Sequence, residues 1–146
     1  MRIGLLIGSA ALFAASVAAA QSLVQIDREV FVERSQERDG RLQRQLMPAE
    51  TLESGDTVVL MLAWRSPQDK PFTISSRVPR ALAFRASGGD TPQVSVDGGR
   101  TWGELAQLRT RGRVATSADV THVRWDVTDP RAANGRGVFT YSAVVR

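Results

Sequence analysis

The segment SVDGGRTW, residues 95–102, combines residue types that can bind an ion or build a tight turn. The carboxylate of Asp97 can accept hydrogen bonds from backbone amides or coordinate a cation such as Ca²⁺. Gly98 and Gly99 can adopt the positive φ angles that a tight hairpin requires, and Trp102 can pack back on a sheet. We predict a structural turn, with contact to calcium or a sugar as the alternative. Its residues are Ser95, Asp97, Gly99, Thr101 and Trp102.

The octapeptide resembles the Asp-box, S-x-D-x-G-x-T-W, which recurs once per blade in the β-propellers of sialidases and related proteins. In those enzymes the Asp-box lies away from the catalytic centre, so the resemblance implies an Asp-box-like hairpin and not a glycosidase activity. The motif occurs once in this chain. A propeller needs at least four blades of roughly 40 residues each, which a chain of 146 residues cannot supply.

A single histidine, His122, restricts the options for hydrolase chemistry. In the run THVRWDV it alternates with Val123, Trp125 and Val127, so we expect it on the exposed face of a strand. The sequence lacks the G-x-S-x-G, H-E-x-x-H and phosphate-loop motifs, and one His without Cys is a poor ligand set for a transition metal. We predict a protein that is not an enzyme and has no cofactor or metal centre. A hydrolase that uses His122 or Asp97 is the least favoured alternative.

One group of charges has a regular spacing. Arg109, Arg111 and Arg113 alternate in LRTRGR, and in an extended strand their side chains would project to one side. Such a row could contact an anionic glycan, lipopolysaccharide phosphates or nucleic acid. The alternative is a solvated basic edge that prevents pairing between strands of different molecules. Because the formal net charge is only +4, nucleic acid is the less favoured partner.

The first 20 residues have the pattern of an export signal. Arg2 provides a positively charged N-terminal region, residues 3–17 are apolar, and three alanines at 18–20 form a small-residue cleavage site. The chain has no Cys, so a lipid-modified Cys and disulfides are both excluded. We predict a signal peptide at 1–20 and one domain at 21–146 that does not span a membrane after cleavage. Its location would be the periplasm, the medium (secreted) or the cell surface of a Gram-negative bacterium.

Short runs of alternating apolar residues, bounded by Gly, Pro, Asp and Asn, predict an all-β fold, an antiparallel β-sandwich of about eight strands. The run at 57–65 is apolar on both faces, as expected of a central strand, with Val58, Leu60, Leu62 and Trp64 sharing one face. The Asp39-Gly40 pair predicts a tight turn after a long first strand, which could be broken near Asp27. The expected strands are 23–34, 42–46, 57–65, 72–78, 82–85, 94–97, 102–105, 121–127 and 138–145.

Three segments resemble the immunoglobulin-like conserved-repeat domains of unknown function that occur in exported and surface proteins of bacteria. They are SGDTVVLMLAWR, PFTISSRVPRALAF and VTDPRAANGRGVFTYSAVVR. The segments SVDGGRTWGEL and ATSADVTHVRW resemble a proteobacterial single-domain subgroup of these proteins. The resemblance covers residues from about 50 to 146 and implies an immunoglobulin-like sandwich without an established activity. The positions that match are scaffold positions: Gly55, Asp56, Val78, Pro79, Leu82, Phe84, Gly137 and Tyr141.

Together these observations predict a non-enzymatic exported β-sandwich that acts in binding or assembly, with an unidentified envelope or surface component as its partner. The alternative is a binder of anionic glycan or lipopolysaccharide that uses Arg109, Arg111 and Arg113. A surface filament subunit is less favoured. Charges at Asp27 and Glu33 interrupt the first strand as edge protection would, so we expect a mainly monomeric protein.

Overall fold

The computed structural model describes residues 23–146, and the predicted signal peptide lies outside them. The described chain is all-β, and its strands pair antiparallel throughout. Two short 3₁₀ helices, η1 at Leu105–Gln107 and η2 at Ser117–Asp119, are the helical segments of this part of the chain. No helix within residues 23–146 has the length and apolar character needed to cross a membrane.

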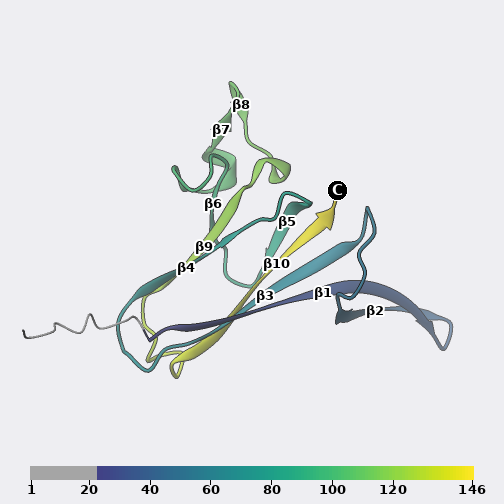
Figure 1. Ribbon diagram of the computed structural model, residues 1–146, viewed down its shortest axis with the longest axis horizontal. Helices are drawn as coiled ribbons and strands as arrows, with labels where there is room; N and C mark the ends of the chain where they lie inside the picture. Colours follow the sequence, from purple (N-terminus) through teal and green to yellow (C-terminus); the bar gives the residue numbers. More distant parts are fainter. Residues whose placement is uncertain (1–22) are drawn as a thin grey trace, which may run out of the picture.

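The larger of the sheets has five strands in the order β2-β1-β3-β10-β5 (Figure 1). Its strands are β1 Gln25–Arg38, β2 Arg41–Pro48, β3 Thr57–Arg65, β5 Leu82–Gly88 and β10 Arg136–Val145. A sheet of three strands has the order β4-β9-β6. Its strands are β4 Phe72–Arg77, β6 Gln93–Ser95 and β9 His122–Val127. The last pair, β7 Arg109–Thr110 and β8 Arg113–Val114, forms a small hairpin that projects from the end of the molecule opposite β1 (Figure 1).

Strand β3 lies between β1 and β10, as its two apolar faces predict. Val58, Leu62 and Trp64 point into the core and are almost fully buried. Leu60 shares their face but is only partly buried. The reason is that the three-stranded sheet does not cover the whole of the five-stranded one.

Aromatic contacts join the two larger sheets through one core. Trp64 of β3 meets Phe72 of β4 edge to face, with ring centroids 5.2 Å apart. Trp125 of β9 stacks on Phe139 of β10 at 5.0 Å, with an angle of 8° between the rings. Strand β4 therefore lies over β3, and β9 lies over β10. Because the smaller sheet ends at β4, it has no strand to place over β1 or β2.

Strands β1 and β2 form a long arm at one side of the molecule (Figure 1). Every residue of β2 is exposed, and so are the last four of β1. The tight turn predicted between them is confirmed, since Asp39 and Gly40 have φ angles of 53° and 72°. The first strand runs from Gln25 to Arg38 instead of 23–34, because its pairing with β2 continues to Arg38. It is not broken at Asp27, which lies within a continuous ladder to β3.

The strand predicted at 102–105 is wrong. Gly103 forms a single bridge with Val94, and the chain then enters η1. The side chain of Trp102 folds back to donate a hydrogen bond to the Gly99 carbonyl. The apolar residues that follow do not extend a sheet: Leu108 is buried in the core, and Leu105 is partly buried against it.

Candidate functional site

The octapeptide 95–102 forms a turn around the carboxylate of Asp97. Its Oδ1 accepts hydrogen bonds from the Thr101 amide at 2.9 Å, the Arg100 amide at 3.1 Å and the Ser95 hydroxyl at 2.8 Å. Gly98 and Gly99 have φ angles of 81° and 89°, which favour glycine. The three donors act on the same carboxylate oxygen, so its hydrogen-bonding capacity is used within the turn.

These donors lower the pKa of Asp97 well below its ordinary value, the Thr101 amide contributing most. Because the folded-state pKa is depressed, the stabilisation is present above the unfolded pKa of about 4 and is lost as pH falls through the folded value. We expect Asp97→Asn to lower the melting temperature by several degrees at neutral pH and by less in acid. Thermal unfolding followed across a pH series measures this. Asp90→Asn, at an exposed carboxylate, is the control, and a loss that does not vary with pH would contradict the role of the charge.

His122 lies beside this turn and is half-buried, not exposed as the alternation predicted. The Trp102 ring covers it edge to face at 6.3 Å, and its Nδ1 is 3.1 Å from the Thr121 hydroxyl. That hydroxyl donates to the Ser95 carbonyl and accepts from the Gly98 amide, so it is part of the scaffold. The structure thus brings His122 near Asp97 without a hydrogen bond between them among the described residues. Residues 23–146 contain no group of three or more His, Asp or Glu side chains that could hold a metal ion.

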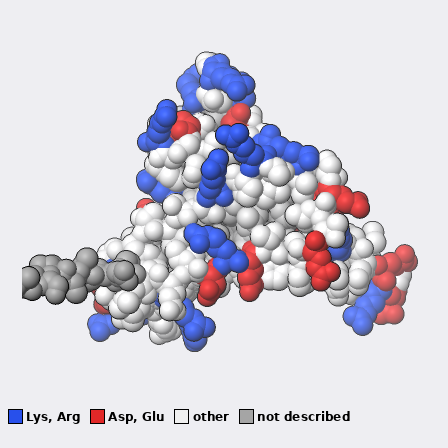
Figure 2. Space-filling model, in the orientation of Figure 1, with Lys and Arg blue, Asp and Glu red and all other residues white. Residues whose placement is uncertain are grey.

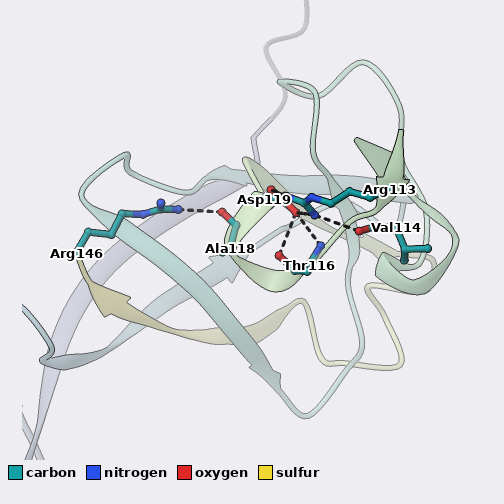
Figure 3. A network of polar contacts seen from close by, with 6 residues as sticks. All are labelled: Arg113, Val114, Thr116, Ala118, Asp119 and Arg146. Atoms are coloured by element: carbon teal, nitrogen blue, oxygen red, sulfur yellow. Dashed lines mark hydrogen bonds and ion pairs between the residues drawn. The ribbon is translucent and has the colours of Figure 1, made fainter. Parts of the chain in front are cut away.

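The single extended strand predicted for Arg109, Arg111 and Arg113 is wrong. The segment is a hairpin in which Arg109 pairs with Val114, and Arg111 and Gly112 form the turn with φ angles of 49° and 78°. Arg113 is bound by both carboxylate oxygens of Asp119, at 2.7 and 2.9 Å (Figure 3). Arg109 and Arg111 stay exposed, so the three guanidinium groups do not form one row.

A groove that the sequence did not indicate lies between β1, β3 and β4. We call it the edge groove; its volume is about 360 Å³. Val30, which is 40% exposed, and the partly buried Leu60 form its apolar wall. Strand β4 forms the opposite side and pairs with β9 only, so its other backbone edge borders the groove. The groove is lined by Arg28, Glu29, Val30, Leu60, Met61, Leu62, Ser75, Ser76, Arg77 and Pro79.

The Tyr141 hydroxyl lies close to the floor of the edge groove. Tyr141 is 1% exposed, and its buried hydroxyl makes no hydrogen bond of standard geometry within residues 23–146, with the Ser76 hydroxyl as at most a weak partner. Burial raises its pKa, while the Ser76 hydroxyl and the Arg28 charge act in the opposite direction. Since Ser76 and Arg28 both line the groove, the hydroxyl sits behind them. A buried polar group without a good hydrogen-bond partner costs about 1–3 kcal/mol, so this hydroxyl lowers the free energy of unfolding of the domain.

This hydroxyl predicts a loss of stability in alkali. Because the folded-state pKa is raised, its stabilisation is complete below the unfolded pKa of about 10 and is lost as pH rises through the folded value. We expect Tyr141→Phe to remove this alkaline loss and, at neutral pH, to be equal to the wild type or about 1 kcal/mol more stable. Urea unfolding at several pH values tests both. Tyr141 is the only tyrosine, so the ultraviolet titration of the phenol gives an independent readout. A marked loss at neutral pH in Tyr141→Phe would show that the hydroxyl has a partner.

Fold and site together define an all-β protein of two facing antiparallel sheets, with a groove beside one strand that is paired on a single side. The comparison of the sequence with protein-family models and with curated proteins, and of the structure with solved structures, finds no match. The groove is formed by residues far apart in the chain, from β1, β3 and β4, which is why no local motif points to it.

Proposed function

We propose that the protein is a non-enzymatic, exported, immunoglobulin-like β-sandwich that binds an extended polypeptide segment in its edge groove, in the periplasm or at the cell surface. The observation that carries the proposal is the free edge of β4 beside an incompletely covered apolar surface. The facing antiparallel sheets support the sandwich, and the apolar leader with its alanine cleavage site supports export.

An added strand would satisfy both features of the groove. Its backbone would pair with the open edge of β4, and every second side chain would point inward over Val30 and Leu60. The smaller sheet would then gain a fourth strand and extend over β1.

The rim of the groove indicates the charge of the partner. Two arginines, Arg28 and Arg77, and one carboxylate, Glu29, line it, and none of them belongs to an ion pair within residues 23–146, so the positive charges are in excess. A segment with acidic residues beside its apolar ones would therefore be favoured. We expect the bound sequence to alternate apolar residues and to carry Asp or Glu at its ends.

Selection from a library of random decapeptides tests this proposal. We expect enrichment of peptides with the stated pattern, and slower hydrogen exchange at the β4 amides when a synthetic peptide of the enriched sequence binds. Val30→Arg should weaken that peptide at least tenfold, because it places a charged side chain in the groove. Val138→Arg is the matched control, since Val138 is 55% exposed on the opposite face of the same sheet. No enrichment, or equal binding by Val30→Arg and the wild type, would overturn the proposal.

A second candidate function is the binding of an anionic glycan or lipopolysaccharide at the tip of the β7-β8 hairpin. Figure 2 shows Lys and Arg side chains gathered on this end of the molecule. Arg109 and Arg111 would provide the contact, whereas the charge of Arg113 is compensated by Asp119. Retention on heparin or lipopolysaccharide resin should fall when Arg109 and Arg111 are both replaced by Gln. Replacing Arg113 alone should have a smaller effect, and equal effects would count against this site.

A further inference from the structure

A second pocket, which meets the edge groove at Arg77 and Pro79, lies between the β4-β5 connection, the Asp97 turn and the end of β10. We call it the arginine pocket; its volume is about 350 Å³. Three arginines and the single histidine line it: Arg77, Arg80, Arg146 and His122. No Asp or Glu side chain is among its lining residues. Segments that are far apart in the chain thus place their cationic side chains around one hollow.

Arg146 is held in place without being neutralised. Its Nε donates to the Leu82 carbonyl at 3.2 Å, and its NH2 donates to the Ala118 carbonyl at 2.9 Å (Figure 3). Its main-chain amide donates to the Ala81 carbonyl. Both side-chain acceptors are neutral, so the guanidinium group keeps its positive charge and its remaining donors. A group fixed in this way loses little conformational freedom when it binds an anion.

Carboxylates near the pocket in sequence are engaged elsewhere. Asp97 directly precedes the lining residue Gly98 but is not itself a lining residue; its Oδ1 accepts hydrogen bonds from neutral donors of its own turn, so it keeps its negative charge outside the pocket. Asp119 precedes the lining residue Val120, but both of its oxygens bind Arg113 (Figure 3). None of the ion pairs within residues 23–146 includes Arg77, Arg80 or Arg146. The side chains that line the pocket therefore carry a net positive charge that no ion pair within residues 23–146 offsets.

We propose that the arginine pocket binds a doubly or more highly charged oxyanion, a phosphate or sulfate group of a small ligand. Guanidinium groups present fork-shaped pairs of donors that match the oxygens of these groups. Donors that come from several sides suit a tetrahedral anion better than a planar one. The pocket also has an apolar wall, formed by Val78, Leu82 and Val120, which can contact the rest of the ligand. This proposal goes beyond strand binding, because Arg80, Arg146 and His122 do not line the edge groove, although Arg77 and Pro79 line both hollows.

Titration with sodium pyrophosphate tests the proposal, with sodium chloride at equal ionic strength and pH as the reference. His122 is the only histidine, so its ring signals in NMR report on this pocket alone. We expect these signals to shift in a saturable manner with pyrophosphate and with sulfate, and much less with citrate, which supplies only carboxylates. Arg80→Gln should weaken pyrophosphate about tenfold, which corresponds to one lost charge-assisted contact.

Arg85→Gln is the matched control, because Arg85 is exposed on β5 and does not line the pocket. It should bind pyrophosphate as the wild type does. Arg80 is exposed and belongs to no ion pair within residues 23–146, so its replacement should leave the fold intact, which the melting temperature checks. An equal shift with sodium chloride, a response to citrate alone, or equal losses in Arg80→Gln and Arg85→Gln would overturn the proposal. None of these outcomes depends on whether a peptide binds the edge groove.

Discussion

Replacing Trp125 by Ala should cost about 3–5 kcal/mol of the free energy of unfolding, which is a large part of the 5–15 kcal/mol typical of a domain. Trp125 is 3% exposed and stacks on Phe139 at 5.0 Å, with Tyr141 at 6.4 Å. It joins the two larger sheets at the centre of the core, and its Nε1 donates to the Asp90 carbonyl. The substitution opens a cavity between the sheets and leaves that carbonyl without its partner.

Urea unfolding of the purified domain measures this loss. Trp125→Phe should recover much of the stability, because a phenyl ring can keep the contact with Phe139. Trp102→Ala is the second control: Trp102 is half-buried at the edge of the smaller sheet, where it contacts His122 and lies 4.5 Å from the Arg124 guanidinium. Its removal should cost clearly less. If the two Trp→Ala variants lose equal stability, Trp125 is not the main connection between the sheets.

Gly137→Ala should lower stability by about 1–3 kcal/mol, although only a methyl group is added to a strand. A Cβ atom at this position would lie 2.5 Å from Nε1 of Trp64 and 2.7 Å from its Cε2. Gly137 is the direct partner of Trp64 in the ladder between β10 and β3, and the ring is held against Phe72. Since the ring is rigid and 3% exposed, either the ring or the strand must shift.

Gly103→Ala provides the matched control for this substitution. Gly103 also takes part in a β-bridge, but a Cβ atom there would meet only Leu108, at an ordinary distance of 3.6 Å. We expect a change of less than 1 kcal/mol at this site. Thermal or urea unfolding of both variants compares them directly. Similar losses would mean that the general effect of glycine replacement outweighs the clash with Trp64.

Much of the fold follows from local pattern in the sequence. Alternation places Val58, Leu62 and Trp64 in the core, and β3 has the predicted bounds 57–65. The Asp39-Gly40 turn is equally local, because the residue types themselves favour positive φ angles. The hairpin at Arg111-Gly112 was missed, since Arg is an uncommon residue at the first position of such a turn. A pattern of alternate residues cannot distinguish one strand from two that are joined by a two-residue turn.

The two candidate sites could not be predicted from the sequence, because they depend on tertiary packing. The edge groove depends on which strand of one sheet lies opposite which strand of the other, and the arginine pocket combines Arg77, Arg80 and Arg146 through tertiary packing. Alternation predicts which side chains point away from the core, but it does not predict which residues they contact on the outer face. The alternation around His122 placed Val123 and Trp125 in the core but missed the cover that Trp102 provides.

The position of β10 in the sheet has a consequence for how the chain folds. This strand is the last one in sequence order, yet it lies inside the five-stranded sheet, between β3 and the edge strand β5. Until it is available, β5 has no neighbour in that sheet and Trp125 lacks the ring on which it stacks. Contacts between such distant parts of a chain form slowly, because a long loop must close first. The domain should therefore stay unfolded until its final ten-residue strand is present, and C-terminal truncation before Arg136 should abolish folding altogether.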